Sequence, residues 1–156
     1  VDSLMFCLSK GLASPAGSML CGKQDFITRA RRMRKRFGGG LRQAGILAAC
    51  GIISLEKMTL RLDEDHKSAK ELAKRIVDAG LLFVHIDTVE TNILILTPPD
   101  GKKWTATQFA QTAKEEGVLV TFMGERNIRL VTHNDYSPDW ISETVERIRK
   151  AVSKLG

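Results

Sequence analysis

The sequence predicts an α/β protein, in which helices pack against sheets. Three observations support this fold class. Two short apolar segments near the start of the chain flank a turn rich in Gly, Ser and Pro, which is typical of a pair of strands. A long apolar helix is expected over 41–62. From about residue 65 onward, segments of helical and strand periodicity follow in the order α-β-β-α-β-β-α, which indicates a small α+β unit with a mostly antiparallel sheet.

The first forty residues are expected to form two strands and one helix. We place the strands at 3–9 ("SLMFCLS") and 17–22 ("GSMLCG") and expect both to be buried. Helical spacing over 23–37 puts apolar side chains on one face and arginines on the other. The apolar positions are Phe26, Ala30, Met33 and Phe37. The "GGG" run at 38–40 should end this helix.

The helix expected over 41–62 is apolar nearly all round in its first part, so we expect it to be buried or packed at an interface. Helical periodicity continues over 63–80 and ends at Gly80. A break or bend is expected near Asp63–Asp65, because carboxylates favour the start of a new helix.

The last part of the chain alternates strands with two helices. Strand patterns occur at 81–86, 91–97, 118–123 and 127–133, and a helix is predicted over 105–117. A closing helix should have Ser137 as its N-cap and Pro138 at its first position. Trp104 and Trp140 are expected to be packing residues.

Composition indicates a soluble globular protein: 43% of residues are hydrophobic and 27% are charged. No segment approaches the roughly 18 consecutive apolar residues that a membrane span needs, and the start of the chain does not resemble a signal peptide. Its abrupt start at valine suggests a fragment or a processed chain. The three cysteines form no CxxC motif, so we expect buried free thiols and a reducing, cytoplasmic setting, with an organelle matrix as the alternative.

The net charge of +6 is concentrated in "RARRMRKR" at 29–36. One basic helix of this kind can bind a nucleic-acid backbone, and it can equally serve a small anionic cofactor. The histidines His66, His85 and His133 show no spacing typical of metal ligands, so we predict no metal site.

Lys10 is the first candidate for chemistry. It follows an apolar strand and precedes a glycine, so its backbone should lie at a buried edge while its amine faces a cleft. A lysine amine in such a place can condense with the aldehyde of pyridoxal phosphate or with a carbonyl substrate. A solvated lysine at the end of a strand would show the same local sequence.

Several motifs in combination resemble the low-specificity L-threonine aldolases. They are "SKGL" around Lys10, "GGGLRQAG" at 38–45, "HKSAKELA", "TNILIL" and "IRLVTHND", in the same order across nearly the whole chain. The resemblance implies pyridoxal 5'-phosphate as the cofactor and the aspartate-aminotransferase-like fold, called fold type I. It also implies that the chain is the C-terminal portion: 1–40 would end the large cofactor-binding domain, 41–64 would be an interdomain helix, and 65–156 would be the small domain.

The same resemblance implies roles for four residues. Lys10 would hold the cofactor covalently, and Arg42 would reach its phosphate across a subunit interface. Lys35 would lie near the same site, also supplied by a neighbouring subunit, and Arg129 would hold the substrate carboxylate. A guanidinium suits both anions, because it donates two parallel hydrogen bonds. The side chains of Ile128 and Leu130 should point to the opposite face of the strand from Arg129 and anchor it in the core.

The implied reaction is cleavage of L-threonine or L-allo-threonine to glycine and acetaldehyde by a homo-oligomer, a dimer or tetramer, with shared active sites. The family residues that stack on the cofactor and pair with its ring nitrogen precede the lysine, so the 156-residue chain alone is expected to be inactive. The alternatives are another lyase of the same fold, such as a β-eliminating lyase or a phenylserine aldolase, a basic nucleic-acid-binding module, or a structural remnant. The aldolase interpretation predicts an amino-acid substrate and neither a nucleic-acid nor a membrane partner.

Overall fold

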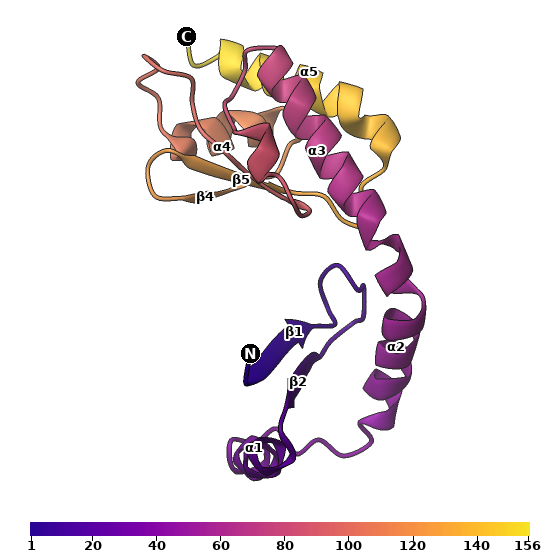
Figure 1. The fold of residues 1–156 in the computed structure, drawn as a ribbon. Coiled ribbons are helices and arrows are strands. Elements are labelled where there is room, and N and C mark those ends of the chain that lie inside the picture. Colours follow the sequence, from indigo (N-terminus) through magenta and orange to yellow (C-terminus); the bar gives the residue numbers. More distant parts are fainter. The chain divides into compact units, whose positions relative to one another are not determined.

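The computed structural model describes all 156 residues, which form two compact units, Val1–Leu62 and Asp63–Gly156 (Figure 1). We call them unit 1 and unit 2 and describe each by itself. None of the helices combines the length and the hydropathy needed to cross a bilayer. The assignment of 1–40, 41–64 and 65–156 to a large domain, an interdomain helix and a small domain stays a prediction.

Unit 1 contains a two-stranded sheet and two helices (Figure 1). Its elements are β1 (Ser3–Cys7), β2 (Ser18–Gly22), α1 (Gln24–Arg36), α2 (Gly45–Glu56) and a 3-10 turn (Met58–Arg61). The strands are antiparallel, with Leu4 opposite Cys21 and Cys7 opposite Ser18. Gly38 follows α1 with a φ of +81°, so the glycine run ends this helix as predicted.

The predicted burial of β1 and β2 is wrong for this structure, and α2 is not buried within unit 1. Leu4 and Met5 are 55% and 59% exposed, and Ile46 of α2 is 74% exposed. Leu8 and Leu12 are the only buried hydrophobic residues of unit 1, so its strands and α2 have little apolar surface of their own unit to pack against. Whether α2 packs at an interface stays a prediction.

The cysteines and the long helix also differ from expectation. All three cysteines are free, but Cys21 is exposed, and Cys7 and Cys50 are only half-buried, because the strands and the helix that carry them lack cover. The helix expected over 41–62 begins at Gly45, and the 3-10 turn at Met58–Arg61 interrupts it before the break expected at Asp63–Asp65.

Unit 2 has a three-stranded antiparallel sheet with strand order β3-β5-β4. Its regular elements are α3 (Leu62–Asp78), β3 (Ile93–Leu96), α4 (Ala106–Glu115), β4 (Thr121–Met123), β5 (Asn127–Val131) and α5 (Ile141–Ser153), with 3-10 turns at Ile86–Thr88 and Pro138–Trp140. Thr105 and Gln108 form a reciprocal capping box at α4. The prediction that Ser137 caps the closing helix is wrong, because Ser137 accepts from the Asp139 amide at the 3-10 turn and α5 begins only at Ile141.

The core of unit 2 lies between the sheet and the apolar faces of α3, α4 and α5. On β3, Leu94 and Leu96 are fully buried, whereas Ile93 and Ile95 are 38% and 40% exposed. This alternation shows that one sheet face is covered by helices and that the other is open. Phe109 of α4 is the largest fully buried side chain, and burial of such a residue contributes about 2–3 kcal/mol.

The strand predicted at 81–86 is wrong. Only Phe83 pairs with another segment, through two hydrogen bonds with Thr97 of 2.8 and 2.9 Å. Leu81, Leu82 and Val84 are nevertheless buried in the core. The apolar run therefore indicates a buried segment but not a strand, because periodicity alone does not distinguish a buried strand from another buried segment.

Candidate functional site

The backbone around Lys10 is held by hydrogen bonds that close the loop between β1 and β2. The Leu8 amide donates to the Gly17 carbonyl at 3.0 Å, and the Ser14 amide donates to the Leu8 carbonyl at 2.9 Å. A tight turn follows, because the Ala13 amide donates to the Lys10 carbonyl at 2.8 Å. The Lys10 side chain itself is exposed. The loop thus presents a solvent-accessible primary amine on an ordered backbone.

Close packing beneath the loop explains its small residues. A Cβ placed on Gly17 or on Gly51 of α2 would lie 3.3 or 3.1 Å from Cδ1 of the buried Leu8. Ala13 adopts a left-handed φ of 53°, which costs a non-glycine residue about 1–2 kcal/mol. Strain of this kind persists only where the surroundings enforce it, and it is enriched at functional sites.

The connection between α1 and α2 carries the other two candidates of unit 1. Lys35 lies on the exposed last turn of α1, and Arg42 is exposed in the turn that precedes α2. Next to Arg42, Gln43 has the second left-handed φ of a non-glycine residue in the chain, 52°. Neither Lys35 nor Arg42 forms an ion pair, and the first turn of α2 contains no acidic residue. Arg42 is therefore a cation without an ion-pair partner close to the N-terminus of α2, which is a favourable place for an anion.

Arg129 lies in the middle of β5, the central strand of the unit 2 sheet, opposite Ile95 of β3 and Thr121 of β4. Its neighbours Ile128 and Leu130 are 0% and 6% exposed, which confirms that they anchor the strand in the core. By strand alternation, Arg129 lies on the open face of the sheet. Three of the four candidates thus belong to unit 1 and Arg129 to unit 2.

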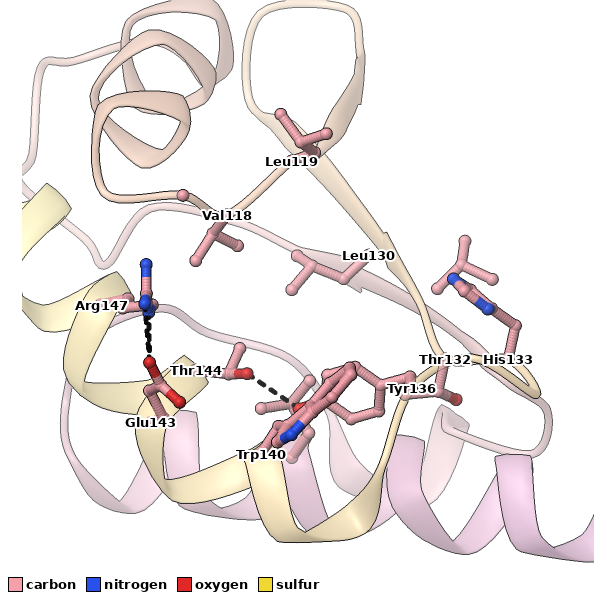
Figure 2. A pocket seen from close by; sticks show the side chains of 13 residues that line it. Val118, Leu119, Leu130, Thr132, His133, Tyr136, Trp140, Glu143, Thr144 and Arg147 are labelled. Carbon is pink, nitrogen blue, oxygen red and sulfur yellow. Dashed lines mark hydrogen bonds and ion pairs between the residues drawn. The ribbon is translucent and has the colours of Figure 1, made fainter.

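The sequence analysis missed a pocket in unit 2, between the end of β5 and α5 (Figure 2). Its volume is about 380 Å³. Tyr136 and Trp140 contribute aromatic rings to its wall, and Trp140 is 52% exposed rather than packed as expected. Burial raises the pKa of the Tyr136 phenol, and its hydrogen bond with Thr144 opposes that rise. The sequence pattern that could have indicated this pocket is the i,i+4 spacing of Tyr136 and Trp140 and of Glu143 and Arg147.

Comparison with known proteins identifies the family. A profile of the family described as "Beta-eliminating lyase" matches residues 1–98. The chain belongs to this beta-eliminating lyase family. It is 39% identical over 153 residues to the low specificity L-threonine aldolase of Escherichia coli (strain K12), and 35% identical over 151 residues to low-specificity L-threonine aldolase 1 of Arabidopsis thaliana.

These alignments cover 98% and 97% of this chain but 44% and 42% of the relatives, so the chain spans about two-fifths of the length of the curated relatives it matches. The fold agrees with the same assignment. A solved structure of SPT with pyridoxal phosphate superposes with a TM-score of 0.75 at 16% identity, over all of this chain and 41% of that one. The predicted fold class, the C-terminal part of a fold-type-I chain with a mostly antiparallel sheet in its last part, is therefore confirmed.

Proposed function

We propose that the chain is part of a pyridoxal-phosphate-dependent lyase that cleaves L-threonine and L-allo-threonine to glycine and acetaldehyde. The observation that carries the proposal is Lys10, an exposed amine on an ordered loop directly after β1. The likeness to relatives named L-threonine aldolase, across 97% and 98% of the chain, supports the choice of reaction.

The residues present fit the cofactor in chemical type. Lys10 supplies a primary amine for its aldehyde carbon, and Arg42 and Lys35 are cations without ion-pair partners that suit its phosphate. Bound pyridoxal phosphate would supply an electron sink for the pair of electrons released when the Cα–Cβ bond breaks.

Arg129 is the residue we assign to the substrate. Its guanidinium lies on an open sheet face next to Ile95, and its strand is anchored by Ile128 and Leu130. A planar fork of donors on a rigid strand can bind both oxygens of a carboxylate and so fix the orientation of the bonds at Cα. Arg129 therefore positions the bond to be cleaved.

The complete site needs more than this polypeptide. We propose that it is shared between subunits of a homo-oligomer, a dimer or tetramer, with Arg42 and Lys35 serving a neighbouring copy, and that the 156 residues alone do not turn over threonine. Three free thiols, one of them exposed, suit a reducing compartment such as the cytoplasm.

The test is borohydride reduction of a polypeptide of the relatives' full length in the presence of pyridoxal phosphate, followed by peptide mapping. We expect the pyridoxyl label on the peptide that contains Lys10, and none after Lys10→Ala. The matched control is Lys23→Ala, which changes another exposed lysine of unit 1 and should leave the label in place. Label on any other lysine of the wild type would overturn the assignment.

A second candidate is β-elimination, which the matching family description favours. Product analysis separates the two reactions: acetaldehyde and glycine from threonine support the aldolase, benzaldehyde from phenylserine a phenylserine aldolase, and ammonia with a keto acid β-elimination. Nucleic-acid binding by α1 accounts for its exposed arginines but for neither the Lys10 loop nor Arg129.

A further inference from the structure

The pocket of unit 2 lies at the end of β5. Leu130, Val131 and Thr132 line it, whereas Arg129 does not. At about 380 Å³, it falls in the size range of small-molecule sites. None of the four residues assigned to the proposed aldolase reaction lines this pocket.

The wall combines apolar and polar side chains in about equal parts. Figure 2 shows Val118 and Leu130 on one side of the pocket and Thr144 and Trp140 on the other. The rings of Tyr136 and Trp140 meet edge to face, with centroids 6.1 Å apart. A half-exposed indole beside aliphatic side chains leaves apolar surface that a ligand could remove from water.

One end of the pocket carries a charged pair with unused hydrogen-bonding groups (Figure 2). Nε and Nη2 of Arg147 both donate to the same oxygen of Glu143, Oε1, at 3.0 and 2.6 Å. Nη1 donates to the Glu116 carbonyl at 2.6 Å. A guanidinium has five N–H groups, so two stay free on Arg147, and Oε2 of Glu143 accepts no hydrogen bond.

The charged pair is partly exposed, since the side chains of Arg147 and Glu143 are 43% and 60% exposed. The carbonyl of Glu116 at the end of α4 accepts from Nη1, and the absence of a side chain at Gly117 leaves room for that atom, since a Cβ there would lie 2.5 Å from it. These contacts restrict the guanidinium, and a restricted side chain loses less conformational entropy when a ligand binds. Free donors on Arg147 and a free acceptor on Glu143 therefore belong to the same end of the pocket.

We propose that this pocket binds a free α-amino acid with an aromatic or aliphatic side chain. The ligand carboxylate accepts from the free N–H groups of Arg147, the ammonium donates to Oε2 of Glu143, and the side chain lies against Val118, Leu130 and Trp140. Because Arg147 and Glu143 neutralise each other, the pocket favours a zwitterion over a ligand that carries a single charge. A bound ligand would contact the strand that carries Arg129.

The test uses the full 156-residue chain without cofactor and follows the two indole N–H signals by ¹H–¹⁵N NMR. The probes are L-phenylalanine, phenethylamine, which lacks the carboxylate, and 3-phenylpropionate, which lacks the ammonium. We expect L-phenylalanine to shift the Trp140 signal but not that of the buried Trp104. The two analogues should bind at least about tenfold more weakly, since each loses a charge-assisted hydrogen bond.

Two variants locate the site. Glu143→Gln should weaken L-phenylalanine about tenfold, to the level of 3-phenylpropionate. The matched control is Glu146→Gln on the same helix, which removes the exposed Glu146–Arg149 pair outside the pocket and should leave the affinity unchanged.

Two results would overturn the proposal: equal affinities for all three probes, which would mean simple apolar binding, or no shift of the Trp140 signal by L-phenylalanine up to its solubility. Arg129→Leu should leave binding intact, because Arg129 does not line the pocket. Loss of binding in that variant would place the ligand at the substrate site instead. Since no cofactor is present, the outcome is independent of the borohydride test.

Discussion

Gly117 offers a quantitative test of how the end of α4 is built, because Gly80 ends α3 in the same way. In both places the amide of the glycine and the next amide donate to carbonyls of the last helical turn. After α4, Gly117 donates to Lys114 at 3.0 Å and Val118 to Ala113 at 2.8 Å. After α3, Gly80 donates to Val77 at 2.9 Å and Leu81 to Ile76 at 3.2 Å. The φ angles are +79° and +65°. The two sites differ in space. A Cβ on Gly80 meets nothing within 4 Å, whereas one on Gly117 would lie 2.5 Å from Nη1 of Arg147.

The expected cost of Gly→Ala follows from these two geometries. Left-handed backbone costs alanine about 1–2 kcal/mol at either site. At Gly117 the flexible Arg147 side chain must also move and lose its charge-assisted bond to the Glu116 carbonyl. Such bonds contribute about 1.5–3 kcal/mol, but this side chain is 43% exposed, so solvent reduces the loss to about 1 kcal/mol. Gly80→Ala should therefore cost about 1–2 kcal/mol and Gly117→Ala about 2–3 kcal/mol.

Urea unfolding followed by tryptophan fluorescence measures the difference, because both tryptophans, Trp104 and Trp140, belong to unit 2. In the background of Arg147→Met, the extra cost of Gly117→Ala over Gly80→Ala should disappear, since no guanidinium remains to be displaced. Equal destabilisation by the two single substitutions would refute the reasoning.

Three further predictions concern titration and packing. Tyr136 is the only tyrosine, so absorbance titration of its phenol should show a pKa above the ordinary 10.0, because burial opposes ionisation. Thr144→Val should raise this pKa further by removing the opposing hydrogen bond. Since the folded state holds the proton more tightly, unit 2 should lose stability as pH rises above about 10, and an unshifted titration would contradict this. The hydrogen bond from Lys154, at 2.7 Å, holds the pKa of Glu116 below its usual value. The ion pair therefore stabilises the fold above the ordinary pKa of the carboxyl group, and this contribution is lost as pH falls through the lowered pKa. Lys154→Met should destabilise the chain in urea unfolding more at pH 7 than at pH 3, and an equal effect would argue against the pair. Leu8→Ala truncates a side chain that is only 6% exposed, so it should lower the free energy of unfolding of unit 1 by about 2–3 kcal/mol and speed amide exchange in the loop that follows Leu8. Unchanged exchange would show that Leu8 does not hold the loop.

Local patterns predicted much of the fold. The turn before α5 follows from Ser137 and Pro138, and the end of α1 follows from its glycines, because these residues act within a few positions of themselves. The alternation of Ile128, Arg129 and Leu130 predicted which side chains enter the core and which lies on the open face of β5. In each case the period of a single element carries the information.

The candidate site was predicted less completely. Lys10, Arg42 and Lys35 could be named from motifs, but the left-handed backbone of Ala13 and Gln43 beside them has no signature in residues of those types. The pocket of unit 2 was missed because Val118, Leu130 and Trp140 come from three separate segments of the chain. Only their packing brings these side chains around one cavity.

The amino-acid order by itself determined where α1, α3 and α4 end, which face of β3 and of β5 is apolar, and where the candidate lysine lies in the chain. Tertiary structure alone decided that the apolar run at 81–84 enters the core without forming a strand, that β1, β2 and α2 leave apolar surface exposed, and that Arg147 bonds both to Glu143 and to the Glu116 carbonyl. The physical reason is that periodicity reports which side of a segment avoids water, whereas the partner that covers that side, or fails to, is set by segments distant in sequence.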